Sequence, residues 1–328
     1  MQMVNMSFRE AITTALREEM ERDPSVILLG EDVGRHGGAR GVTKGLWQTF
    51  GPTRVIDTPI SEQAISGACC GAALGGLRPV AECFIGDIIM FMADSLVTSS
   101  ARMHFATGGE LNVPLVIRGA DASRPDGGPH QDTFANWFAN VPGLKVVIPS
   151  TPRDAKGLMI SAIRDDNPVI FMEPIRLYDT VGPVPVGEFT IPIGKAEVRA
   201  EGSDVTIATI GGCVALAAEA KEDWDKRGVS IEVLDLRSLR PLDTESIHAS
   251  VKKTGRLIVV HEGWTHYGIG AEVIATASEM PGINWRATPQ RVGTLETHLP
   301  ASIILSRAVL PNRERLDAAI ERAMAKPD

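Results

Sequence analysis

Apolar residues near the amino terminus recur every three or four positions, as they do along one face of an α-helix. They are Phe8, Ala11, Ile12, Ala15, Leu16 and Met20. Ser7 and Glu10 introduce this pattern with the S-x-x-E spacing of a capping box, and Asp23-Pro24 follows it. Because such signals mark the start and the end of a helix, we predict a helix between Ser7 and Asp23. The apolar run 26–29 then predicts a buried strand.

Strand-like and helical patterns alternate through the rest of the chain, which indicates parallel sheets covered by helices on both faces. The first half predicts strands at 79–84, 113–118, 144–148 and 169–172, and helices at 64–77, 87–102 and 150–164. The second half predicts strands at 205–210, 231–234 and 257–260, and helices at 215–227, 244–253, 270–278 and 312–325. We expect two doubly wound α/β domains, at 1–175 and 203–328, joined by a proline-rich linker at 176–202.

Composition narrows the class of protein. The 328 residues carry a net charge of −8 with both signs interspersed, so we expect no nucleic-acid partner. No apolar run approaches the ~18 residues of a membrane span, so we expect none. The four cysteines lack C-x-x-C spacing, so we interpret them as reduced structural thiols rather than as a zinc site or a disulfide framework. Reduced thiols are typical of a reducing compartment, and we therefore expect a cytoplasmic location.

Glu62 is the most informative candidate for chemistry. It follows the apolar pair Val55-Ile56 closely and precedes the helical pattern 64–77, so it lies where a strand gives way to a helix. Ligands of open α/β sheets bind at such carboxyl ends of strands. Two interpretations remain open: burial could raise the pKa of Glu62 and let it share a proton, or it could simply favour the start of the helix through the helix dipole.

Familiar phosphate-binding and nucleophile motifs are absent from the sequence. It contains no G-x-x-x-x-G-K-[ST] and no G-x-G-x-x-G after a strand. The glycines of the helix 64–77 suggest close helix packing instead, which could lie between subunits. They are Gly67, Gly71, Gly75 and Gly76.

His130 ends a glycine- and proline-containing loop at 119–131 and precedes an aromatic cluster at 134–138. Long loops of this kind often carry function, and a histidine there could exchange protons near neutral pH. A structural loop histidine explains the same position, and both interpretations stay open. His261 and His266 flank a turn after a strand and are weaker candidates for facing a ligand.

At this point several segments match a known family in order and spacing. The longest are Leu29-Gly30-Glu31-Asp32-Val33, Arg54-Val55-Ile56-Asp57-Thr58-Pro59-Ile60-Ser61-Glu62, Val113-Pro114-Leu115-Val116-Ile117-Arg118 and Ala162-Ile163-Arg164-Asp165-Asp166-Asn167-Pro168-Val169. Along nearly its whole length the chain resembles the β subunit of the decarboxylating component of 2-oxo acid dehydrogenase complexes. These complexes act on pyruvate, branched-chain 2-oxo acids or acetoin. The resemblance implies a transketolase-type pyrimidine-binding domain followed by a transketolase C-terminal domain.

The resemblance also implies thiamine diphosphate as cofactor and assigns residues to it. Glu62 would hydrogen-bond a ring nitrogen of the aminopyrimidine, which prepares removal of the proton on the thiazolium carbon. Glu31 and Ile88 would belong to the same cofactor site, and His130 would lie near the substrate. The chain departs from the family pattern at Ile88, where an aromatic residue is common, and at Gln131-Asp132, where the family has Ser-Gln.

The family's Gly-Asp-Gly motif for diphosphate and magnesium is missing, because the single Gly-Asp pair, Gly86-Asp87, is followed by Ile88. The resemblance therefore implies an α subunit that holds the diphosphate and magnesium, in an assembly of two α and two β subunits, and a lipoyl acyltransferase core as the acyl acceptor. It also suggests a potassium site built from backbone carbonyls, although a structural helix end explains the same residues. The carbonyls are those of Leu115, Ala162, Ile163, Asp165 and Asn167.

Three functional hypotheses follow. The first is a catalytic β subunit that oxidatively decarboxylates a 2-oxo acid, or cleaves acetoin, and transfers the acyl group to a lipoyl carrier. The second is a non-catalytic scaffold of the same fold that docks an acyltransferase core. A single-chain enzyme similar to transketolase is disfavoured by the missing diphosphate motif.

Overall fold

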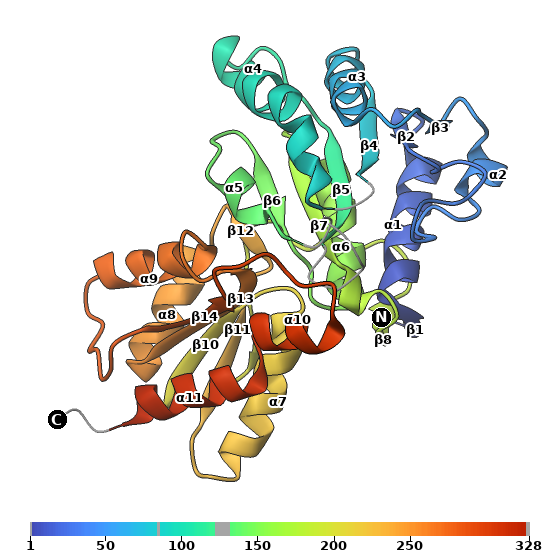
Figure 1. Ribbon diagram of the computed structural model, residues 1–328. Helices are drawn as coiled ribbons and strands as arrows, with labels where there is room; N and C mark the ends of the chain where they lie inside the picture. Colours follow the sequence, from blue (N-terminus) through green and yellow to red (C-terminus); the bar gives the residue numbers. More distant parts are fainter. Residues whose placement is uncertain (1, 84–85, 122–131, 326–328) are drawn as a thin grey trace. The chain divides into compact units, whose positions relative to one another are not determined.

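The computed structural model describes residues 2–83, 86–121 and 132–325 (Figure 1). The chain forms two compact units. Unit 1 comprises Met1–Ala122 and Trp137–Ile193, and unit 2 comprises Ser123–Asn136 and Gly194–Asp328. Each unit has its own sheet and its own hydrophobic core.

Unit 1 is built on a parallel sheet with the strand order β6-β7-β5-β4-β2-β3. Its strands are β2 (Val26–Gly30), β3 (Val55–Asp57), β4 (Arg78–Cys83), β5 (Val116–Asp121), β6 (Lys145–Val147) and β7 (Val169–Pro174). Strands β2, β5 and β7 are buried at every residue, which explains why most of their residues are apolar. Strand β5 continues to Asp121, three residues beyond the predicted strand.

The first helix, α1 (Phe8–Arg22), confirms the predicted capping box. The backbone N–H of Glu10 donates to the Ser7 hydroxyl at 3.2 Å, and the backbone N–H of Ser7 donates to the Glu10 carboxylate at 2.7 Å. Both hydrogen bonds satisfy N–H groups that an uncapped helix leaves unpaired. The buried face of α1 packs against α6 (Pro152–Arg164), and this pair covers one face of the sheet (Figure 1).

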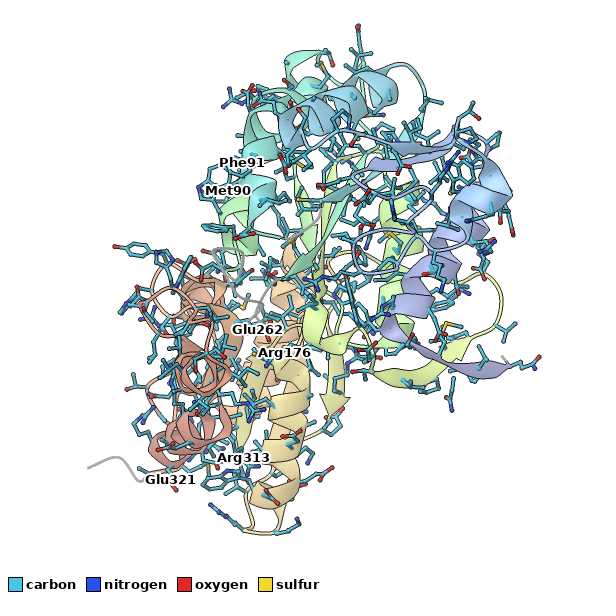
Figure 2. All side chains as sticks on the ribbon, turned by 45° about the vertical axis from the view of Figure 1, so that its right-hand side comes forward. Met90, Phe91, Arg176, Glu262, Arg313 and Glu321 are labelled. Carbon is cyan, nitrogen blue, oxygen red and sulfur yellow. The ribbon has the colours of Figure 1, made fainter. Side chains whose placement is uncertain are left out.

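The segment 87–102, predicted to be helical, is helical over most of its length but is not one regular α-helix. The structure has a 3₁₀ turn η1 (Ile88–Met92), a π-helical segment η2 (Asp94–Ser100) and the short helix α4 (Ala101–Ala106). The Ser100 hydroxyl donates to the carbonyl of Ser95 at 2.9 Å, five residues back, which favours the wider π turn. Figure 2 labels Met90 and Phe91, which η1 carries beside this break.

The proline-rich segment after β7 contributes to both units. Its first part forms η3 (Ile175–Leu177) and β8 (Val181–Pro185), and β8 pairs antiparallel with β1 (Met3–Ser7). This two-stranded sheet tolerates prolines because it consists only of edge strands. Two short helices, α2 (Leu46–Phe50) and α5 (Ala135–Ala139), occur earlier in the chain.

Unit 2 has a five-stranded sheet in the order β14-β13-β10-β11-β9, in which only β9 is antiparallel to its neighbour. Its strands are β9 (Glu197–Ala200), β10 (Val205–Thr209), β11 (Ile231–Asp235), β13 (Leu257–Trp264) and β14 (Gln290–Thr294), with the short β12 (Ser238–Arg240) outside this sheet. Its helices are α7 (Cys213–Asp225), α8 (Thr244–Thr254), α9 (Ile269–Glu279), α10 (Ile303–Val309) and α11 (Arg313–Met324). The predicted alternation of this half is thereby confirmed, with β9, β12, β14 and α10 added.

The core of unit 2 lies between this sheet and the helices α7 and α11. Figure 2 labels Arg313 on α11, whose guanidinium donates to Asp317 at 2.8 Å and to Asp223 at 3.0 Å, so this ion-pair network links α11 to α7. Among the helices in the described part of the chain, none is both long and apolar enough to cross a bilayer.

Candidate active site

Glu62 is the first residue of α3 (Glu62–Leu74), five residues after β3 ends at Asp57. Its neighbour Ser61 is the N-cap of α3 but makes no side-chain capping hydrogen bond. Glu62 is partly exposed, and within the described residues its carboxylate has no hydrogen-bonding partner. The chain alone therefore does not provide the burial that we expected from the sequence, and the carboxylate does not cap the helix by hydrogen bonding.

Glu31 and Glu62 follow β2 and β3, which are neighbouring parallel strands that end at the same edge of the sheet. Glu31 directly follows β2. Partial burial, the charge of Asp32 and the charge of Glu62 together raise the pKa of Glu31. The fold thus brings the two predicted acidic residues into electrostatic contact at the carboxyl ends of the strands, where α/β sheets bind ligands.

Ile88 begins η1 and is partly buried. Helix α3, which carries Glu62, packs against both η1 and η2. The amide of Gln63 strengthens this contact by donating to the Asp94 carboxylate at 3.0 Å. Ile88 therefore belongs to an element that packs against α3, the helix that begins with Glu62.

Four of the five proposed potassium carbonyls already have hydrogen-bond donors within the chain. The guanidinium of Arg78 donates to the carbonyls of Ile163 and Asp165 at 3.0 and 3.1 Å. The carbonyl of Ala162 accepts the N–H of Asp165, and that of Leu115 accepts the N–H of Val169. The cationic side chain of Arg78 thus already binds two of the five carbonyl oxygens. Whether Leu115, Ala162, Ile163, Asp165 and Asn167 bind potassium stays a prediction.

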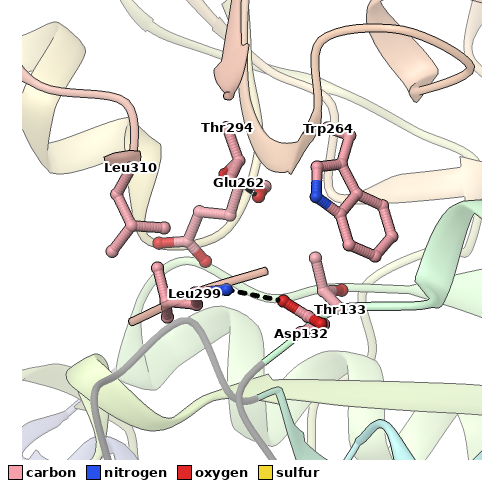
Figure 3. Close-up of a pocket in the computed structure, with 7 residues that line it drawn as sticks. All are labelled: Asp132, Thr133, Glu262, Trp264, Thr294, Leu299 and Leu310. Carbon is pink, nitrogen blue, oxygen red and sulfur yellow. Dashed lines mark hydrogen bonds between the residues drawn. The ribbon is translucent and has the colours of Figure 1, made fainter. Parts of the chain in front are cut away.

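His130 falls outside the described residues, so its position is not part of the geometry. The chain is described again from Asp132, which lines a small pocket in unit 2 (Figure 3). The backbone N–H of Leu299 donates to Asp132 at 3.2 Å, and His298 Nδ1 lies 2.7 Å from the other carboxylate oxygen. Asp132 is therefore fixed to unit 2 two residues after His130.

Sequence reasoning missed a buried cluster of charges in unit 1. Arg118 of β5 contacts both Glu82 of β4 and Glu173 of β7, and the hydroxyl of Tyr178 donates to Glu173 at 2.6 Å. Although burial alone lowers the pKa of Arg118, the charges of Glu173 and Glu82 outweigh it and raise this pKa further. The available signal was a charged residue within each of three strands that are otherwise largely apolar.

His261 is a second buried polar residue that the sequence marked only weakly. It lies in β13 with 2% of its surface exposed, and neither ring nitrogen has a hydrogen-bond partner within the described residues. Burial, with a smaller effect from Arg291, lowers its pKa to about 4. His261 is therefore neutral near pH 7. Among the described residues, no group of three or more His, Cys, Asp or Glu side chains is arranged to hold a metal ion.

Comparisons with known proteins place this geometry in a family. The model of the transketolase pyrimidine-binding domain matches residues 4–180, and that of the transketolase C-terminal domain matches residues 194–316. A rice protein named pyruvate dehydrogenase E1 component subunit beta-1, mitochondrial, is 42% identical over 323 residues, which cover 97% of this chain and 86% of that protein. The 2-oxoisovalerate dehydrogenase subunit beta of Bacillus subtilis strain 168 is 40% identical and covers 96% of this chain and 97% of its own length.

The chain belongs to the family of 2-oxo acid dehydrogenase E1 β subunits. A rat member, the mitochondrial pyruvate dehydrogenase E1 β subunit, is 39% identical over 98% of the chain. A solved structure of a split-gene transketolase, an inactive β4 tetramer, aligns with a TM-score of 0.80 over 98% of this chain and 99% of that one, at 22% identity. This likeness supports the fold alone. The resemblance and the fold class predicted from the sequence are confirmed.

The E1 β family membership corrects one expectation. We expected a cytoplasmic protein, but the rice and rat relatives are named as mitochondrial. The expectation rested on free cysteines, and the structure does contain four free, buried thiols. Reduced thiols do not distinguish one reducing compartment from another, so this argument could not support the location that we inferred.

Proposed function

We propose that this E1 β-family chain acts with an α subunit in the oxidative decarboxylation of a 2-oxo acid and in transfer of the acyl group to a lipoyl carrier. The proposal is carried by the acidic pair Glu31 and Glu62 at the carboxyl ends of β2 and β3. Thiamine diphosphate, when bound, supplies the electron sink for decarboxylation. The residues of this chain supply proton handling and orientation.

The donor set at the site fits the aminopyrimidine half of that cofactor. Glu62 has a carboxylate without a partner in the described residues, and a carboxyl group that can hold or release a proton suits a basic ring nitrogen. Glu31, whose pKa is raised by partial burial and by the charges of Asp32 and Glu62, adds a second carboxyl group at the end of the neighbouring strand. Partly buried Ile88 offers an apolar contact to a flat ring from the neighbouring element.

The diphosphate half of the cofactor does not fit this chain. The sequence has no Gly-Asp-Gly motif, and the described residues contain no acidic or histidine cluster suited to magnesium. We therefore assign the diphosphate and magnesium to an α subunit, in an assembly of two α and two β subunits. We assign His130 to proton exchange near the substrate, because a histidine on a loop can change protonation near neutral pH.

The substrate class that we propose is a 2-oxo acid, and the final acyl acceptor is the lipoyl group of an acyltransferase core. The names of the relatives point to pyruvate or a branched-chain 2-oxo acid, since one acts as a pyruvate dehydrogenase subunit and another as a 2-oxoisovalerate dehydrogenase subunit. Acetoin is not favoured by any of these names. Potassium at the carbonyls of Ile163 and Asp165 would compete with the guanidinium of Arg78, which already donates to both.

Calorimetry tests the shared site. Thiamine diphosphate with magnesium is titrated into the isolated chain, into the α partner alone, and into the two chains purified together. The proposal expects saturable binding only when both chains are present. Tight, magnesium-dependent binding to the isolated chain would overturn it, because this chain would then hold the diphosphate without a partner.

A further inference from the structure

A buried arginine in unit 1 connects the sheet interior to the candidate site. Arg118 has 1% of its surface exposed, and its guanidinium bonds Glu173 through two nitrogens, one of them at 2.7 Å, and Glu82 through the third. Both carboxylates are also buried, with 0% of Glu173 and 5% of Glu82 exposed. Buried charges persist only when they are paired, so this cluster holds all three side chains in fixed orientations.

Glu82 differs from Glu173 because its carboxylate also contacts a loop. The backbone N–H of Ala39 donates to Glu82 Oε1 at 3.1 Å. Gly38 lies directly against the same carboxylate, since a Cβ atom there would lie 2.9 Å from both of its oxygens. Gly38 also has a φ of +82°, which favours glycine. The loop therefore rests on Glu82 at a position that leaves no room for a side chain.

This loop, residues 31–43, is also held by Asp57 and by a hydrogen bond between two of its own residues. The backbone N–H of Gly34 donates to Asp57 at 2.6 Å, and a Cβ atom at Gly34 would lie 2.4 Å from that carboxylate. Within the loop, the Thr43 hydroxyl donates to the carbonyl of Val33 at 2.8 Å. The loop begins with Glu31. Its two attachments, to Glu82 and Asp57, thus fix the segment that follows Glu31, whose pKa the charge of Glu62 helps to raise.

We infer that Glu82, oriented by Arg118, is a positioning residue that sets the approach of Glu31 to Glu62 by fixing the loop 31–43. The inference rests on the proposed function, because that function assigns Glu31 and Glu62 to the cofactor site. Glu173 provides a matched comparison. Glu173 pairs with the same guanidinium from β7, the strand on the other side of β5, and it is buried to a similar extent. Within the described residues, however, no hydrogen bond joins Glu173 to the loop.

The test compares Glu82→Gln with Glu173→Gln in the assembled complex with the α partner. Each variant removes one carboxylate from buried Arg118, so both should lower the melting temperature. Only Glu82→Gln should slow deuterium exchange of the thiazolium C2 proton, by about tenfold, the size typical of residues that orient a catalytic group. It should also shift the acidic limb of the kcat/KM profile, whereas Glu173→Gln should leave both within about twofold of wild type after correction for folded fraction.

Gly38→Ala keeps the test decisive if either carboxylate variant fails to fold. This change leaves the Arg118 contacts intact and places a methyl group against the Glu82 carboxylate, so it should move the loop and reproduce the exchange defect. Wild-type exchange and pH profile in both Glu82→Gln and Gly38→Ala would overturn the inference, and so would equal exchange losses in the two carboxylate variants. Glu62→Gln is measured in parallel. If exchange is lost in Glu62→Gln but retained in Glu82→Gln, only the positioning role is refuted. If exchange is retained in Glu62→Gln, the proposed function itself is refuted.

Discussion

Glu31 directly follows β2, Glu62 begins the helix after the neighbouring parallel strand β3, and the charge of Glu62 helps to raise the pKa of Glu31. Partial burial of Glu31 is the larger cause, followed by the charge of Asp32. The charge of Glu62 thus couples the two residues electrostatically. The pH dependence of the reaction should therefore be sensitive to Glu31, even though only Glu62 is assigned to the aminopyrimidine.

The first prediction concerns this coupling. Glu31→Gln removes the carboxyl group whose pKa is raised, so the pH profile should lose its contribution. The acidic limb of kcat/KM in the assembled enzyme should move to lower pH, by up to about one unit. An unchanged acidic limb, in a variant with normal cofactor binding, would separate Glu31 from the reacting site.

The second prediction concerns His130. If this histidine exchanges a proton with the substrate or the acyl group, His130→Ala should lower reductive acylation of the lipoyl carrier at least about tenfold at saturating cofactor. His104→Ala serves as the control, because His104 is an exposed histidine of α4 whose ring bonds Asn112 at 2.8 Å. Full activity in the His130 variant would assign that residue to structure.

The third prediction concerns stability in acid. The pKa of His261 is lowered to about 4 from an ordinary value of 6.5, so the unfolded chain binds the proton more readily than the folded chain between these values. The contribution of His261 to stability is complete above the ordinary value and is lost as the pH falls toward 4. By linkage, this loss amounts to about 3 kcal/mol.

Chemical unfolding at a series of pH values tests this contribution. His261→Leu should flatten the acid dependence of the free energy of unfolding by roughly that amount, because it removes the titrating group. His266→Asn is the control, since His266 is exposed and its ring lies 3.2 Å from the carboxylate of Glu296. Parallel acid profiles for wild type and His261→Leu would show that His261 is not protonated on unfolding.

The sequence predicted the alternation of strands and helices well because buried parallel strands form continuous apolar runs. It also identified both ends of α1, since the capping box of Ser7 and Glu10 is a local signal. Non-local features were not predictable in this way. Strand β1 pairs with β8, with Met3 opposite Pro185, and nothing near either strand specifies this partner. The π-helical break in 87–102 likewise depends on where the Ser100 hydroxyl bonds.

The candidate site was predicted in part for the same reason. Glu62 stood out because a carboxylate at a junction between a strand and a helix is a local pattern. Its relation to Glu31 depends on the order of strands in the sheet, which places β2 beside β3. The link from Arg118 through Glu82 to Ala39 crosses three separate segments, and only the folded chain brings them together.

Deuterium exchange at the thiazolium C2 of the cofactor, followed by NMR in the assembled complex, tests the central claim most directly. Glu62→Gln preserves side-chain size but removes the acid–base group, so exchange should fall by a factor on the order of 10² while cofactor still binds. Glu314→Gln, in the first turn of α11, controls for loss of an acidic residue at a helix start and should leave exchange unchanged. Wild-type exchange in Glu62→Gln, with a stability loss of about 1 kcal/mol or less, would contradict the account and leave Glu62 as a helix-start residue.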